Sequence, residues 1–183
     1  LGSIAALKGL KVRVIGREWP KLINAFGATP VAMPWPEVYE SLARGTLDAN
    51  VGFVTANRDS KLYEVAKHHT RIALGAPAGP VAIMNRATWE GLPKDIQQII
   101  RDLGREFPDK LASLFETELA DATAQMQRSG VTFYGWPAPD RARLRSAMEA
   151  NWKTWAEGLD SKGLPASEAL RLYLALQAKH AGR

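Results

Sequence analysis

The pattern of apolar and polar positions predicts alternating strands and helices in the first third of the chain. Val12 and Val14 share one face of the first predicted strand, and Arg13 lies on the other, because side chains alternate along a strand. Apolar residues at helical spacing, followed by a glycine, mark each predicted helix. The predicted elements are strand 11–15, helix 20–26, strand 30–33, helix 36–44 and strand 47–54. This β-α-β-α-β order favours a parallel sheet with helices on its faces.

The rest of the chain is predicted to be mainly helical. Asn85 is expected to cap a short helix, and Pro108 is expected to kink or split a long one that carries an apolar stripe from Ile96 to Met126. The predicted elements are helix 59–69, strands 71–74 and 81–84, helix 86–90, helix 96–129, strand 131–134, helix 144–158 and helix 167–181. We therefore expect an α/β lobe over residues 1–88. Residues 89–183 are expected to supply the long connecting helix, a return strand and C-terminal helices.

Composition and charge exclude several classes of function. Apolar residues make up 46% of the chain and charged residues 23%, as in ordinary globular proteins, and no run approaches the ~20 apolar residues of a membrane span. The net charge is +5, but the cations are spread along the chain and interleaved with acids, so no nucleic-acid partner is expected.

Catalytic and metal chemistry find little support in the sequence. The chain has no cysteine, and the neighbouring His68 and His69 are expected at a helix end, where adjacent side chains point in different directions. No phosphate loop, dinucleotide fingerprint or nucleophile motif is present. We expect no catalytic residue, no cofactor and no metal site.

Arg13 is the sharpest candidate for a functional side chain. A guanidinium between Val12 and Val14 is costly to bury unless an anion meets it, and its planar fork matches a carboxylate. The alternatives are that Arg13 lies on an edge strand and pairs with Asp48 or Glu37, or that it faces water. The strand order places Arg13 and Trp35 near the carboxyl ends of neighbouring strands, where open α/β sheets bind ligands.

Several segments in order resemble one family. They are KGLKVRVIG, GATPVAMPWPEVYESLARGTLDANV, KLYEVAKHHT, WEGLPKDIQQII and SGVTFY, and together they resemble the DctP-like substrate-binding proteins of TRAP transporters. The resemblance implies an α/β fold like a lobe of a type II periplasmic binding protein, with a mainly parallel sheet followed by long C-terminal helices. It also implies a periplasmic location, solute binding without catalysis, and delivery of the solute to the TRAP membrane permease subunits. The alternative is a small ligand-sensing or enzymatic α/β domain on the same fold.

The resemblance also assigns candidate ligand-binding residues. Arg13 matches the arginine that fixes the ligand carboxylate in the family, and Trp35 stands where relatives often have a phenylalanine that packs on the ligand. A place in the hydrophobic core is an equally good interpretation of Trp35. Trp19 is a further candidate for lining the cleft.

The segment Asn50-Val51-Gly52-Phe53 departs from the family pattern. Relatives typically have a Gln-Glu-Asn-Pro sequence here, whose polar side chains contact the ligand or a bound cation, whereas this chain has Val51, Gly52 and Phe53 after Asn50. The expected pocket is more apolar, so a small organic acid with an apolar or aromatic body fits it better than a sugar acid does.

Relatives also have an N-terminal lobe before the first of these strands. We expect the C-terminal helices to be built to pack on such a lobe, and so to expose an apolar patch when it is absent.

Overall fold

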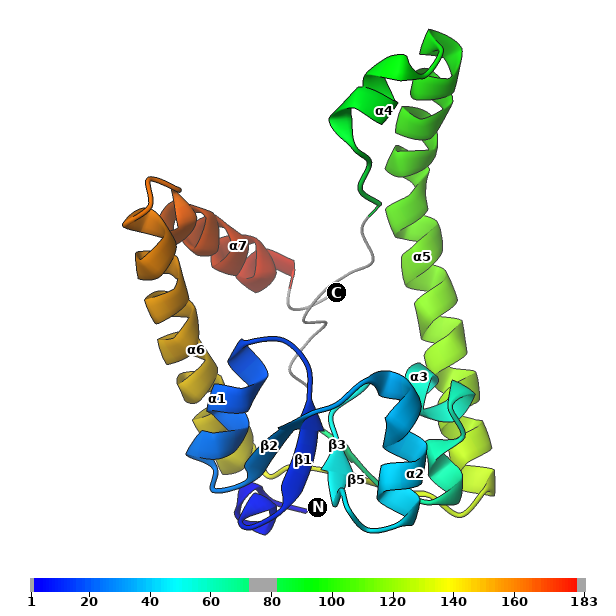
Figure 1. The fold of residues 1–183 in the computed structure, drawn as a ribbon, viewed down its shortest axis with the longest axis vertical. Coiled ribbons are helices and arrows are strands. Elements are labelled where there is room, and N and C mark those ends of the chain that lie inside the picture. Colours follow the sequence, from blue (N-terminus) through cyan, green and yellow to red (C-terminus); the bar gives the residue numbers. More distant parts are fainter. Residues whose placement is uncertain (1, 73–81, 181–183) are drawn as a thin grey trace. The chain divides into compact units, whose positions relative to one another are not determined.

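The computed structural model describes residues 2–72 and 82–180 (Figure 1). The chain forms two compact units. The first, here called the sheet unit, contains the residues up to Val51, a short stretch that begins at Thr70, and the residues from Tyr134 onward. The second, here called the α5 unit, contains Gly52–His69 and the later residues up to Phe133. The predicted division at residue 88 concerns which part faces a ligand, and stays a prediction.

A parallel three-stranded sheet forms the centre of the sheet unit. Its strands are β1 (Lys11–Val14), β2 (Thr29–Ala32) and β3 (Ala49–Asn50), in the spatial order β2-β1-β3. Both pairings are parallel, which confirms the predicted arrangement. The first strand is therefore central, and both of its edges are paired.

Two helices, α1 (Glu18–Ala25) and α2 (Val38–Ala43), alternate with these strands along the chain, as the pattern predicted. The 3-10 turn η1 (Ile4–Leu7) precedes β1, and the 3-10 turn η2 (Trp35–Glu37) precedes α2. Gly27 and Gly45 follow the two helices in left-handed conformation, with φ of 78° and 68°. Buried apolar side chains of the unit come from η1, β1 and α1, and include Ile4, Leu7, Val12, Val14, Leu22 and Ile23.

The sheet unit ends in two helices, α6 (Ala138–Asp160) and α7 (Ala166–His180), with the last predicted residue, Ala181, outside the described residues. Asp140 in the first turn of α6 accepts a hydrogen bond from the backbone N–H of Ile4 at 2.9 Å. Asp160 closes the corner between the two helices. Its carboxylate accepts from the N–H groups of Ala166 and Ser167 and from the Ser167 hydroxyl.

The segment after β3 differs from the prediction. The strand expected over 47–54 has only two residues, and Val54 instead begins a helix, α3 (Val54–Asp59). The helix expected over 59–69 is wrong as well. Lys61 takes a left-handed conformation with φ of 54°, which ends the helix and starts the short turn η3 (Leu62–Glu64).

His68 and His69 lie on strand β4 (His68–Arg71) and not at a helix end. This strand pairs with β5 (Thr132–Gly135), and the division between the two units falls within both strands. The rings of His69 and Phe133 lie 4.9 Å apart. Residues 82–84 form no strand, and the remainder of the strands predicted over 71–84, residues 73–81, lies outside the described residues.

The α5 unit is built on one long helix, α5 (Lys94–Arg128), of 35 residues. The helix runs through Pro108 without interruption, so the predicted split does not occur. Proline clashes with the carbonyl four residues earlier, and that residue is Gly104, whose backbone is the freest to adjust.

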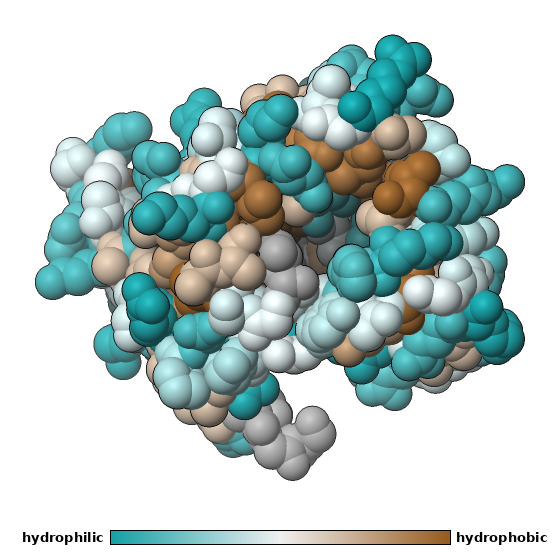
Figure 2. All heavy atoms as spheres, turned by 90° about the horizontal axis from the view of Figure 1, so that it is seen from below, coloured by the Kyte–Doolittle hydropathy of each residue, from teal (hydrophilic) through white to brown (hydrophobic). Residues whose placement is uncertain are grey.

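The apolar stripe of α5 is covered at one end and exposed along the rest. Ala122 and Met126 are buried, at 0% and 3% exposure. The stripe before them is between 37% and 58% exposed, and consists of Ile96, Ile99, Ile100, Leu103, Phe107, Leu114, Phe115 and Leu119. The C-terminal helix α7 also exposes Leu172, Tyr173 and Leu176. Figure 2 shows patches of hydrophobic side chains at the surface among hydrophilic ones. The expected exposure of apolar side chains on these helices is confirmed.

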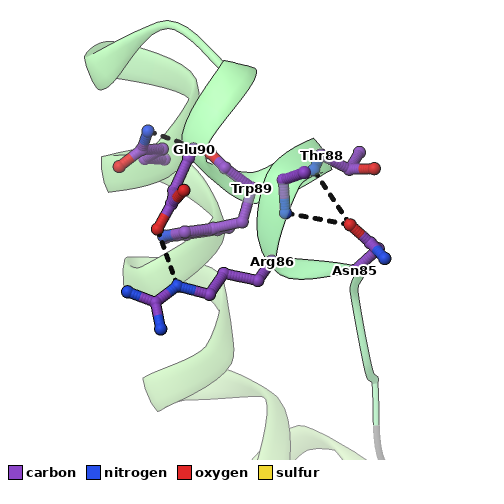
Figure 3. Close-up of polar contacts among 7 residues, drawn as sticks. Asn85, Arg86, Thr88, Trp89 and Glu90 are labelled. Atoms are coloured by element: carbon purple, nitrogen blue, oxygen red, sulfur yellow. Dashed lines mark hydrogen bonds and ion pairs between the residues drawn. The ribbon is translucent and has the colours of Figure 1, made fainter.

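A polar corner joins α5 to the short helix α4 (Arg86–Gly91) (Figure 3). Asn85 caps α4 as predicted, and its side-chain oxygen accepts from the N–H of Ala87 at 2.9 Å. Gln97, only 2% exposed, donates to the carbonyls of Trp89 and Leu92 at 3.0 and 2.9 Å. These bonds satisfy buried polar groups, so we interpret the corner as structural.

Candidate ligand-binding site

Arg13 occupies the central strand of the sheet unit and is 5% exposed. Its register partners are Val31 on β2 and Asn50 on β3. Because Arg13 lies on a central strand and is buried, neither the edge-strand nor the water-facing alternative holds. Arg13 is buried together with its neighbours Val12 and Val14 on β1, so the strand places a cation inside the sheet unit.

The guanidinium of Arg13 is held by one backbone carbonyl and one aromatic ring. Its Nε donates to the carbonyl of Met33 at 3.1 Å, and its Cζ lies 5.1 Å from the centroid of the Trp35 ring. The ring face attracts the cation, and the contact fixes the plane of the guanidinium. Burial away from water lowers the pKa of Arg13 from its ordinary value, because a desolvated cation is disfavoured.

Among residues 2–72 and 82–180, no carboxylate pairs with Arg13. The proposed partner Asp48 instead accepts a hydrogen bond from the backbone N–H of Lys11 at 2.7 Å. Within the same described ranges, the Met33 carbonyl is the hydrogen-bond acceptor that Arg13 contacts. The two terminal nitrogens of the guanidinium are thus the groups suited to a carboxylate from outside the chain.

Trp35 lies three residues after the end of β2 and opens the 3-10 turn η2. The flanking Pro34 and Pro36 restrict the backbone, which explains why the indole reaches the guanidinium rather than the sheet core. The side chain is half-buried, so part of the ring stays accessible. The Met33 carbonyl was not predicted, because a backbone acceptor leaves no signal in the side-chain pattern.

The other candidates lie in three places. Asn50 on β3 is the register partner of Arg13, and the N–H of the next residue, Val51, donates to the Arg13 carbonyl at 2.9 Å, so the backbone of both lies beside Arg13. Trp19 is partly exposed on the first turn of α1. Gly52 and Phe53 belong to the α5 unit, where Phe53 is 51% exposed and precedes α3. Arg13, Trp35, Asn50 and Val51 are therefore the part of the predicted set that lies together within the sheet unit.

The part of the chain that the structure describes brings no three His, Cys, Asp or Glu side chains together as metal ligands. Within the same part, no helix combines the length and the apolar character needed to cross a membrane.

Comparison with known proteins places this chain in a family. The family model of bacterial extracellular solute-binding proteins, family 7, called DctP, matches residues 1–158. The chain belongs to this DctP family. One curated relative, the C4-dicarboxylate-binding periplasmic protein DctP of Rhodobacter capsulatus, is 28% identical over 163 residues. That match covers 88% of this chain and 49% of the relative, so the chain spans about half the length of the curated relative.

Solved structures agree with the DctP assignment. A TRAP periplasmic solute-binding protein from Desulfovibrio salexigens with bound orotic acid is 28% identical, with a TM-score of 0.79. The alignment covers 98% of this chain and 57% of that protein. A TRAP solute-binding protein from Rhodoferax ferrireducens T118 in complex with copurified benzoate is 26% identical, with a TM-score of 0.80, over 100% of this chain and 58% of that protein. The fold is therefore the α/β fold of periplasmic binding proteins, as predicted. The family consists of transporter binding proteins, not enzymes.

Proposed function

We propose that this chain supplies the carboxylate-binding part of an extracytoplasmic solute receptor that serves a TRAP transporter in the periplasm. The receptor binds a small organic acid and delivers it to the membrane permease subunits. The observation that carries the proposal is Arg13, a buried cation on a central strand that pairs with no carboxylate among the described residues. A buried charge is costly, and an anionic ligand offsets that cost.

The bound acid has an apolar or aromatic body in this proposal. The half-buried Trp35 ring next to the guanidinium offers a flat apolar surface beside the carboxylate position. Val51, beside Arg13 in the sheet unit, supplies no side-chain hydrogen bond for a hydroxylated ligand. The relatives that hold orotic acid and benzoate are consistent with a planar acid.

Titration calorimetry with benzoate and galacturonate tests the proposal. We expect benzoate to bind more tightly, and Arg13→Ala to weaken benzoate by about 1.5–3 kcal/mol, the scale of a hydrogen bond to a charged group. Arg44→Ala is the matched control, because Arg44 is an exposed cation on the neighbouring α2 region, paired with Glu40 at 3.2 Å. Equal affinity of wild type and Arg13→Ala would remove Arg13 from the site. The mass of any acid that copurifies with the protein would name the natural ligand.

The exposed stripe of α5 has a place in the same proposal. Its apolar residues include two adjacent pairs, Ile99–Ile100 and Leu114–Phe115, so the stripe is wider than the narrow seam of a coiled coil. This geometry suits packing against a globular lobe better than a coiled coil. We propose that residues 89–183 pack on the second lobe of the receptor. Hydrogen exchange along α5 in a receptor of full family length tests this, and fast exchange over Ile96–Phe107 would contradict it.

A further inference from the structure

Helix α7 follows α6 in the sheet unit (Figure 1) and has apolar side chains on two sides. Ala166, Leu170 and Leu174, spaced four residues apart, are buried or half-buried, and α7 packs on α6. Leu172 and Leu176 are offset from this set by two residues, which places them on the opposite side of the helix. They are 49% and 57% exposed, so the outer side of α7 is an apolar stripe at the surface.

Two opposite charges stand at the ends of this outer stripe. Glu168 lies four residues before Leu172, and so shares its side of the helix. Lys179 lies three residues after Leu176, on the same side. Both charged side chains are exposed, and within residues 2–72 and 82–180 neither forms an ion pair. They are about 16 Å apart along the helix axis, at 1.5 Å per residue, so they do not pair with each other.

The outer stripe and its two charges are complementary to an antiparallel copy of themselves. The midpoint between Glu168 and Lys179 in the sequence lies within one residue of the midpoint between Leu172 and Leu176. In an antiparallel pair of α7 helices with a two-fold axis at this point, each Glu168 faces the Lys179 of the other copy. The leucines of both copies then meet between the two ion pairs. A parallel pair would instead place each charge beside its own equivalent.

We propose that the outer side of α7 is a self-association surface, on which α7 of a second copy of this chain packs antiparallel. The inference goes beyond the proposed function and does not depend on it. The DctP family model matches residues 1–158 and ends before α7, so the family assignment does not extend to the pattern on this outer side. Its charges match its own sequence, and that match selects a second copy rather than the second lobe as the occupant. The helix has 15 residues, so the contact is small and the dimer weak.

Sedimentation equilibrium of the purified chain over a range of concentrations tests the surface. We expect the average mass to rise with concentration from that of a monomer toward that of a dimer. Leu176→Gln should raise the dissociation constant of the dimer by about tenfold or more, because both copies lose buried apolar surface. Leu103→Gln on α5 is the matched control, since Leu103 is exposed to nearly the same extent, 58% against 57%, and it should leave the dissociation constant unchanged.

Two charge reversals test the antiparallel pairing. Glu168→Lys and Lys179→Glu each place like charges opposite one another twice in the homodimer, so each should raise the dissociation constant by about tenfold. In an equal mixture of the two variants, one copy is basic at both positions and the other is acidic at both. The mixed dimer therefore restores both ion pairs, and should form about as tightly as the wild-type dimer. This recovery also shows that both variants are folded.

Four results would overturn the proposal. The first is a chain that stays monomeric at every concentration. The second is a dimer that Leu103→Gln weakens and Leu176→Gln does not, which assigns self-association to the stripe of α5. The third is a mixture of the charge variants that associates no better than each variant alone, which excludes the antiparallel pairing. The fourth is a monomer when the same measurement is made on a receptor of full family length, which assigns the outer side of α7 to the second lobe.

Discussion

Two arginines of this chain are both well shielded from water, and they are satisfied in opposite ways. Arg58 in the α5 unit meets two carboxylates of its own chain, and its pKa is raised. Arg13 in the sheet unit meets a carbonyl and an indole ring, and its pKa is lowered by burial. The first arrangement stabilises the fold, whereas the second, in the proposed function, keeps a cation ready for a carboxylate from elsewhere.

The same contrast divides the apolar stripe of α5. Met126, near the C-terminal end of the helix, is 3% exposed, whereas Leu103, nearer its N-terminal end, is 58% exposed. A covered apolar group contributes to folding, and an exposed one contributes only when another surface covers it. Groups with partners inside the chain and groups with partners outside it should therefore respond differently to substitution.

The largest expected effect is on the covered end of α5. Met126→Ala should lower the free energy of unfolding by about 2–5 kcal/mol, because it leaves a cavity in a packed core. Leu103→Gln, on the exposed part of the same helix, should change it by less than about 0.5 kcal/mol. Urea denaturation followed by circular dichroism measures both. A similar loss in Leu103→Gln would mean that the exposed stripe already has a partner within this chain.

The next effect concerns the sign of the stability change at the two arginines. Arg13→Met should raise the free energy of unfolding by about 1 kcal/mol or more, since it replaces a buried cation that lacks a carboxylate partner among the described residues with an apolar side chain, and it should weaken benzoate binding. Arg58→Met should lower stability instead. Thermal unfolding without ligand measures both variants, and destabilisation by Arg13→Met would show that Arg13 is a structural residue.

The sequence predicted the region around Arg13 better than the region around Arg58. Strand β1, helix α1 and the turn at Gly27 follow from local patterns, and Arg13 is conspicuous between two valines. The prediction for residues 54–71 is wrong because two features that local patterns do not encode determine their structure. Lys61 adopts a left-handed conformation that few sequences predict, and His68–Arg71 is extended because it pairs with β5, which lies far along the chain.

For the candidate site, the sequence predicted side chains but not the contacts that they make. Arg13 and Trp35 were named, but their mutual contact and the Met33 carbonyl depend on how the chain turns after β2. The ion pair of Arg58 with Glu118 joins residues that are far apart in the sequence, and no spacing rule relates them.

A smaller effect tests the role of the indole. Trp35→Ala should weaken benzoate by about 1 kcal/mol and weaken a small polar acid such as lactate less, because the ring contributes an apolar surface as well as orienting the guanidinium. Trp35→Phe is the control, which should recover most of the benzoate affinity. Calorimetry with both acids measures the difference, and equal losses for the two acids would favour Trp35 as a core residue.

The smallest effect lies at the corner between α6 and α7, where all partners belong to the chain. The hydrogen bonds from Ser167 lower the pKa of Asp160, so its contribution to stability is present above the ordinary aspartate pKa of about 3.9 and is lost as the pH falls through the lower folded value. Asp160→Asn should loosen the first turn of α7 at pH 7 and remove the acid sensitivity of that turn. Amide exchange of Ala166 and Ser167 at pH 7 and pH 3 measures this, with Glu157→Gln on the same helix as the control. An unchanged acid response in Asp160→Asn would show that another group governs the corner, and that the lowered pKa of Asp160 does not report a contact that holds the two helices together.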